Sequence, residues 1–141
     1  MNKLFFGTIL MLGLALSVSA CQQPQSKRME SISTSQNALE KQTDQYRISV
    51  RLPNPPLKAQ AEAYTLQLHN LKTNQPVEAL PEVKVEMPMG NTPMIAPTTL
   101  KKTATPGEFQ VNTEFTMSGD WTLQVKPVQA AEAITLTLSV Q

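Results

Sequence analysis

The chain has 141 residues, with 12 Lys and Arg, 11 Asp and Glu and a formal net charge of +1. Nucleic-acid binding requires a concentrated positive surface, so a near-neutral chain without a basic cluster argues against nucleic acid as a partner. The single cysteine excludes an internal disulfide.

Residues 1–20 have the pattern of a secretory signal peptide. Lys3 supplies a positive charge, and an apolar run follows from Leu4 to Leu16. This run is too short to cross about 30 Å of hydrocarbon, so we expect a cleaved signal rather than a spanning helix.

The sequence "VSAC" at positions 18–21 resembles a bacterial lipobox. The resemblance implies cleavage before Cys21 and acylation of its thiol and new amine with chains such as palmitate. Several acyl chains anchor a protein durably, so we expect a lipoprotein held on the extracytoplasmic side of a membrane. Gln22, rather than Asp, then favours the outer membrane, facing the periplasm, if the cell is Gram-negative. The alternative is an ordinary signal peptide followed by an unmodified cysteine.

Residues 21–44 are interpreted as the lipidated cysteine and a flexible tether. Gln and Ser are frequent and large apolar groups are few, so this segment buries too little surface to offset the entropy of ordering. A short helix around Asn37–Gln42 is an alternative for its last part. The folded domain is expected over residues 45–141.

This domain is predicted to consist of strands. Apolar and polar residues alternate with a period of two in six segments, which is typical of antiparallel strands with one buried face. The segments are residues 46–52, 63–70, 83–87, 108–117, 121–125 and 134–140, with a weaker strand over 97–103. The 108–117 segment is expected to place Met117 inward at its end, and Trp121 is expected to be the largest core side chain.

Turn residues separate these segments. The sequence "LPNPPL" at 52–57 cannot continue a ladder because proline lacks the amide donor. Gly119 in "SGD" suits a short hairpin connection. About seven short strands with regular turns predict an immunoglobulin-like antiparallel β-sandwich, with a small β-barrel as the alternative.

The order of motifs resembles a known family. A turn ending in "QPV" at 75–77 precedes "MPM" at 87–89, and "GEFQVNTEFTMSGDWTLQV" follows at 107–125. Together these motifs resemble the YtkA-like family, which is related to FixH-like domains, over residues 46–140. The resemblance implies an extracytoplasmic immunoglobulin-like domain of the kind associated with copper handling or oxidase assembly, without enzymatic activity. Many relatives carry a histidine soon after the methionine motif, whereas the loop "GNTPMIAP" here has none.

Four methionines are the candidate metal ligands: Met87, Met89, Met94 and Met117. Thioether sulfur is a soft, uncharged ligand that suits Cu(I). The alternative is ordinary packing, because methionine fills irregular gaps and Met87 and Met117 have the inward parity of their strands. His69, the only histidine, has the outward parity and joins such a site only if it lies at the same end of the domain.

No catalytic arrangement is visible. The carboxylates are scattered, and one histidine with a lipidated thiol leaves no plausible nucleophile and base pair. We therefore expect a non-catalytic accessory binding module, with copper as its ligand. The alternative is a protein interaction or assembly module of an envelope complex that holds no metal.

Overall fold

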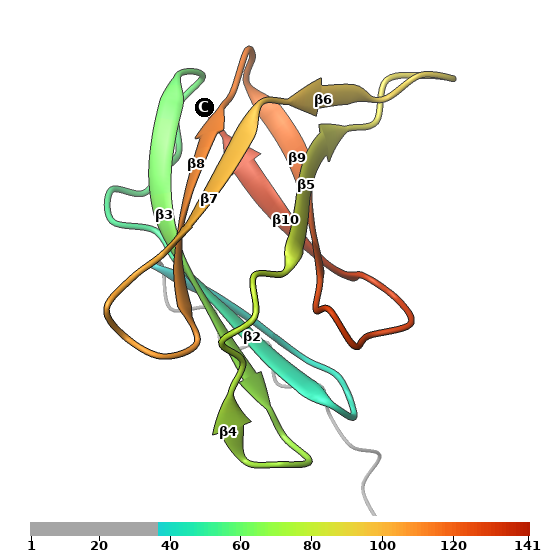
Figure 1. The fold of residues 1–141 in the computed structure, drawn as a ribbon. Helices are drawn as coiled ribbons and strands as arrows, with labels where there is room; N and C mark the ends of the chain where they lie inside the picture. The colour runs from blue at the N-terminus through green and yellow to red at the C-terminus, as the bar shows by residue number, and fades with distance from the viewer. Residues whose placement is uncertain (1–36) are drawn as a thin grey trace, which may run out of the picture. The chain divides into compact units, whose positions relative to one another are not determined.

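The computed structural model of the protein describes residues 37–141, and the predicted signal peptide, Cys21 and most of the predicted tether lie outside them. The described part is all-β, with ten strands in two antiparallel sheets (Figure 1). The strands are β1 (Ala38–Gln42), β2 (Tyr46–Arg51), β3 (Ala61–Asn70), β4 (Gln75–Pro76), β5 (Glu82–Met87), β6 (Met94–Ala96), β7 (Thr98–Lys102), β8 (Glu108–Glu114), β9 (Gly119–Lys126) and β10 (Ile134–Val140).

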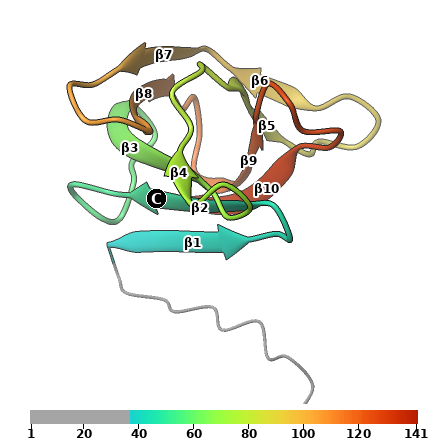
Figure 2. The ribbon, with the colours of Figure 1, turned by 60° about the horizontal axis from the view of Figure 1, so that its bottom comes forward.

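The fold is an immunoglobulin-like sandwich, as predicted, and its strand order agrees with that class. One sheet has the order β1-β2-β3-β8-β7, with β4 beside β3, and the other has the order β10-β9-β5-β6. Strands β2, β3, β8 and β7 correspond to A, B, E and D of an immunoglobulin domain, and β10, β9 and β5 correspond to G, F and C. Figure 2 shows the two sheets packed face to face, with β1 at an outer edge.

Two connections join the sheets at the same end. Between β6 and β7 only Pro97 intervenes, so the chain passes from one sheet to the other without a loop. The proline-rich segment after β2 brings Leu57 beside the last strand, where it forms a parallel bridge with Val140. The backbone N–H of Gln141 donates to the carbonyl of Leu57 over 2.8 Å.

The core lies between the sheets and contains the residues of the predicted inward faces. Trp121 is fully buried and heads the large buried side chains, as expected. Its ring meets that of Phe115 edge to face, with centroids 5.5 Å apart, a favourable arrangement for aromatic pairs. Along β10, Ile134, Leu136, Leu138 and Val140 are buried while the residues between them are exposed.

Three hydroxyl groups form a hydrogen-bonded chain beside the Pro97 crossover, buried at Tyr64 and Thr113 and half-buried at Thr98. The Tyr64 hydroxyl lies 3.0 Å from the Thr113 hydroxyl, which lies 3.3 Å from that of Thr98. Thr98 donates to the Ala96 carbonyl over 3.0 Å. Because that bond uses the only proton of Thr98, the chain of donors runs from Tyr64 through Thr113 to Thr98.

The N-terminal boundary differs from the prediction. Residues Ala38–Gln42, assigned to the tether with a helix as the alternative, form strand β1, which pairs with β2 along five residues. Half-burial of Leu39 against the core and a hydrogen bond from the Lys41 ammonium to the Thr135 carbonyl, 3.0 Å long, hold it in place. The polar composition of this segment concealed the strand, because an edge strand buries little of its surface.

Met117 does not lie in the core. Strand β8 ends at Glu114, and the alternation of buried and exposed residues ends with Phe115, which is still buried. The Met117 side chain is 37% exposed. Its backbone carbonyl instead accepts a hydrogen bond from the Trp121 indole N–H, 3.1 Å away.

Candidate functional site: the methionine rim

The four candidate methionines belong to one end of the sandwich, which we call the methionine rim: Met87, Met89, Met94 and Met117. Strand β5 ends at Met87, and a loop over 88–93 carries Met89 and leads back into β6 at Met94. The turn 115–118 carries Met117 into β9. In Figure 1 this loop and this turn lie at the top of the molecule.

The loop after "MPM" folds back into a short strand. Met94 was expected in a loop, but it begins β6 and stands opposite Met87 in the antiparallel register. Directly opposed residues have Cβ atoms about 4.5–5.5 Å apart, and methionine has three rotatable bonds. The fold therefore brings these two thioethers within reach of a common point.

Both of these side chains contact the turn that carries Met117. The Thr116 hydroxyl donates a hydrogen bond to the Met94 sulfur over 3.2 Å. The Met87 methyl group packs against Gly119, so closely that a Cβ at position 119 would lie 2.8 Å from it. Gly119 has a φ of 137°, a conformation that residues with a side chain rarely adopt.

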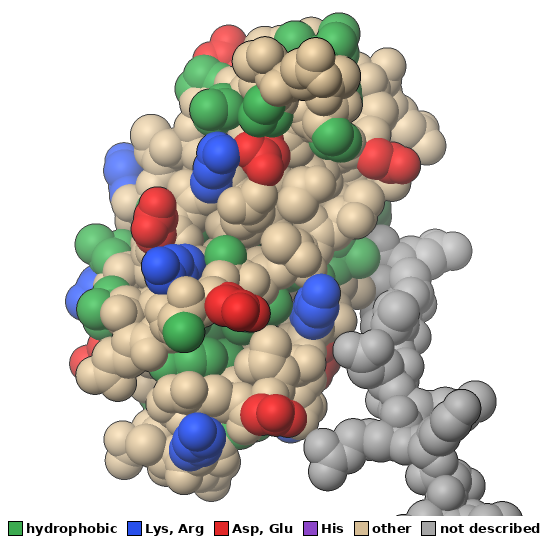
Figure 3. All heavy atoms as spheres, turned by 90° about the vertical axis from the view of Figure 1, so that its right-hand side faces the viewer, with side chains coloured by type: hydrophobic (Ala, Val, Ile, Leu, Met, Phe, Trp, Pro, Cys, Tyr) green, Lys and Arg blue, Asp and Glu red, His purple; other side chains and the backbone are tan. Residues whose placement is uncertain are grey.

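The four methionine side chains of the rim differ in their exposure to solvent. Met87 is 9% exposed and Met94 is half-buried, whereas Met89 is 45% exposed and Met117 is exposed. On the adjoining outer face, Ile95 is 59% exposed. Figure 3 shows several hydrophobic side chains at the upper end of this side of the molecule, with an acidic side chain beside them and further acidic and basic side chains below.

The donors of the rim are neutral sulfur atoms. Thioethers suit Cu(I) and are poor ligands for Zn²⁺, Mg²⁺ or Ca²⁺. Within residues 37–141 there is no group of three or more His, Cys, Asp and Glu side chains placed to hold a metal ion. Chemically, the arrangement fits a soft monovalent ion that two thioethers bind, with the more exposed methionines as further donors.

His69 lies at the other end of the sandwich. It stands near the end of β3, whereas the start of β3 at Ala61 pairs with Glu114, next to the rim. Its ring nitrogen Nε2 lies 3.3 Å from the Asn74 side-chain oxygen. Because about eight residues of extended strand separate the two ends, at roughly 3.3 Å each, His69 cannot join the rim.

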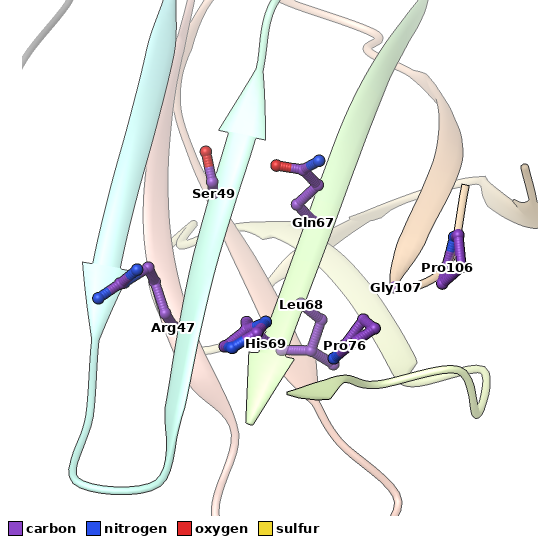
Figure 4. Close-up of a pocket in the computed structure, with 8 residues that line it drawn as sticks. All are labelled: Arg47, Ser49, Gln67, Leu68, His69, Pro76, Pro106 and Gly107. Carbon is purple, nitrogen blue, oxygen red and sulfur yellow. The ribbon is translucent and has the colours of Figure 1, made fainter. Parts of the chain in front are cut away.

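A shallow hollow surrounds His69 on the outer face of the sheet (Figure 4). It has a volume of about 240 Å³, and Arg47, Ser49, Gln67 and His69 approach it from β2 and β3. Sequence reasoning did not predict this hollow, because it forms where β3 changes partner from β8 to β4. The Arg47 guanidinium is already paired with Glu40 at 3.4 Å.

Comparison with protein families supports the resemblance seen in the sequence. A family model described as YtkA-like matches residues 24–126. The chain belongs to the YtkA-like family. This YtkA-like match ends with β9, yet β10 continues the sheet through seven residue pairs with β9. No curated protein and no solved structure matched the chain. In the described part of this YtkA-like protein, no helix is long and apolar enough to span a membrane.

Proposed function

We propose that the protein is a non-catalytic accessory module, anchored to a membrane through lipidated Cys21 and displayed outside the cytoplasm, that binds Cu(I) at the methionine rim. Membership of the YtkA-like family supports an accessory extracytoplasmic domain. The observation that carries the metal proposal is the opposed pair Met87 and Met94. Lipidation rests on the "VSAC" sequence, which lies outside the described residues.

The rim residues have distinct roles in this proposal. Met87 and Met94 are the inner ligands, because Met87 is 9% exposed and Met94 is half-buried, with its sulfur beside the Thr116 hydroxyl. Met89 and Met117 are exposed and complete the ligand set from the outside. A neutral donor set binds the monovalent ion without burying an unpaired carboxylate, which would be costly in the core.

Thr116 competes with the metal for one donor. Its hydroxyl occupies one lone pair of the Met94 sulfur, and a thioether is a weak hydrogen-bond acceptor. Coordination at Met94 therefore replaces only a weak bond, and the exposed Thr116 hydroxyl can turn to water.

The direct test is titration of the purified anaerobic protein with Cu(I) in competition with a chromogenic chelator. The double variant Met87→Leu/Met94→Leu keeps the volume of the side chains and removes the inner sulfur atoms. We expect one ion per chain in the native protein and an affinity lower by an order of magnitude or more in the variant. Ile95→Leu, next to the site but without a donor atom, is the matched control. Equal affinities of the double variant and the native protein would refute the metal site.

Apolar exposure at the same end supports a second function. Met89, Ile95 and Met117 present large side chains to solvent, and exposed apolar groups that adjoin one another mark contact surfaces. In this alternative the rim is the docking surface of an envelope complex and holds no metal. Photo-crosslinking from position 95 in intact cells would distinguish the two, since only the docking function requires a defined protein adduct.

A further inference from the structure

Three loops form one end of the sandwich, which we call the crown: residues 52–60, 88–93 and 115–118. Backbone bonds join them to their neighbours at this end. Phe115 N–H donates to the Gln60 carbonyl over 3.1 Å, and Ala59 N–H donates to the Gln141 carbonyl over 3.1 Å. Two of these loops carry Met89 and Met117, the exposed methionines of the methionine rim.

The three loops of the crown carry little charge. Their exposed side chains are proline and methionine together with a similar number of polar groups, and Lys58 is the single charged residue within the loops. The Glu62 carboxylate lies beside them and accepts hydrogen bonds from the Lys58 N–H over 3.3 Å and from the Gln60 side-chain amide over 3.0 Å. The exposed apolar residues are Pro53, Pro55, Pro56, Pro88, Met89, Pro93 and Met117, with Ile95 beside them.

The opposite end has a different character. Its loops carry Asp44, Lys72, Glu78 and Glu132, all exposed. Leu80 and Val128 are also exposed in the loops of this end. Burying this end against an apolar phase would require the removal of more charges from water than burying the crown.

The described chain begins at the base of the crown. The Asn37 carbonyl accepts a hydrogen bond from the N–H of Leu52, the first crown residue, over 2.9 Å. Strand β1 then runs away from the crown, with Ala38 opposite Arg51 and Gln42 opposite Arg47. Fifteen residues lie between Cys21 and Asn37, and fully extended they span at most roughly 55 Å.

We propose that the crown rests on the surface of the lipid bilayer that holds Cys21. This inference depends on the lipid anchor of the proposed function. The anchor keeps the domain at a high effective concentration near the bilayer, so a modest preference of one end for the interface is enough to orient it. Because the one basic side chain of the crown, Lys58, is accompanied by the Glu62 carboxylate, the crown has no net excess of positive charge. Its contact with lipid therefore does not require anionic headgroups and is insensitive to salt. Met89 and Met117 then face the bilayer surface.

The experiment uses the full lipidated protein in phosphatidylcholine vesicles. With Cys21 acylated, Met89→Cys and Val128→Cys each introduce one thiol for a fluorophore, the first on the crown and the second at the opposite end. Nitroxide-labelled lipids in the bilayer quench a fluorophore that lies near the interface. We expect several-fold stronger quenching at position 89 than at position 128, unchanged between low and high salt.

A charge on the crown provides the second variant. Ile95→Asp, combined with the label at position 89, should reduce the quenching towards the level at position 128, since an exposed Asp disturbs lipid contact and not the fold. Ile95→Leu should leave the quenching unchanged. Equal quenching at both ends, or stronger quenching at position 128, would overturn the proposal.

Two further outcomes separate the causes of failure. If mass spectrometry finds no acyl chain on Cys21 and the protein does not sediment with vesicles, the lipoprotein assignment fails and the inference fails with it. If the protein sediments and the crown label is shielded in native membranes but not in pure lipid vesicles, the anchor stands and the bilayer contact is overturned in favour of a membrane-protein partner.

Discussion

Met87 and Met94 face each other across β5 and β6, and the turn between β8 and β9 closes against both side chains. Thr116 donates to the sulfur of Met94, and Gly119 leaves room for the methyl group of Met87. Strands β5 and β6, which one short loop joins, and the distant segment between β8 and β9 thus define the environment of one pair of thioethers. Their mutual dependence leads to the first prediction.

Substitution of Gly119 by Ala should disturb the rim. The new Cβ would lie 2.8 Å from the Met87 methyl carbon, at a φ of 137°. The flexible methionine can move away, so most of the cost is backbone strain, and we expect a loss of about 1–3 kcal/mol in the free energy of unfolding. Urea denaturation measures the loss, and the ¹³C-methyl resonance of Met87 should shift.

Gly90→Ala is the matched control for this substitution. Gly90 also has a positive φ, 55°, but a Cβ there meets nothing within 4 Å. We expect the free energy of unfolding to fall by about 1 kcal/mol, because alanine is strained in the left-handed conformation, and we expect no shift of the Met87 methyl resonance. A shift of equal size in both variants would show that Gly119 does not position Met87.

The free energy of unfolding should fall at alkaline pH because of the buried Tyr64. Burial raises the pKa of Tyr64 to about 12 from its usual 10.0. Between these values the unfolded chain loses the phenolic proton and the folded chain keeps it, so the free energy of unfolding falls by up to about 1.4 kcal/mol per pH unit. Below pH 10 this contribution is fully present.

The variant Tyr64→Phe isolates this effect. At pH 8 it should be less stable than the native protein by about 1 kcal/mol, because the Thr113 hydroxyl loses a partner. Above pH 10 the difference should shrink and then reverse, since phenylalanine does not titrate. Denaturation curves at pH 8, 10 and 11 measure it, and parallel pH profiles of the two proteins would contradict the assignment.

Oxidation of the four rim methionines should follow their exposure. Sulfoxide formation depends on access of peroxide to the sulfur. Met89 and Met117 are exposed, Met94 is half-buried and Met87 is 9% exposed. We expect Met89 and Met117 to oxidise first and Met87 last, as followed by peptide mass spectrometry. Oxidation of Met87 at the rate of Met89 would show that the turn 115–118 opens readily.

Strand β1 should contribute to folding. A fragment that begins at residue 45 exposes the edge of β2 and loses the partial burial of Leu39. We expect it to be less stable than a fragment of residues 37–141 by about 1–3 kcal/mol, and to aggregate more readily through the open edge. Leu39→Ser in the longer fragment should give a smaller loss without aggregation. Equal stability of the two fragments would show that residues 38–42 belong to the tether and not to the folded domain.

Alternation along the chain determined most of the fold. A side chain in a strand points to the face opposite that of its neighbour, so the inward residues of β2, β3, β8, β9 and β10 could be assigned from parity alone. The same pattern, with turn residues between the segments, indicated the sandwich. The motifs around Met87 and Trp121 indicated the family that the family match then confirmed.

The tertiary structure determined features that the alternation of inward and outward side chains does not reveal. The alternation in the sequence extends to Met117, but Phe115 is the last residue of this segment that the structure buries. Phe115 packs on Trp121, and the Trp121 indole N–H donates to the Met117 carbonyl, while the Met117 side chain is exposed. β6 is three residues long and β1 is polar, so both exist only through pairing with a longer neighbour. The opposition of Met87 to Met94, and the distance of His69 from both, depend on register between strands. Register is set by the loop geometry in the β5–β6 hairpin and elsewhere by contacts between residues far apart in the chain, whereas periodicity describes each segment by itself.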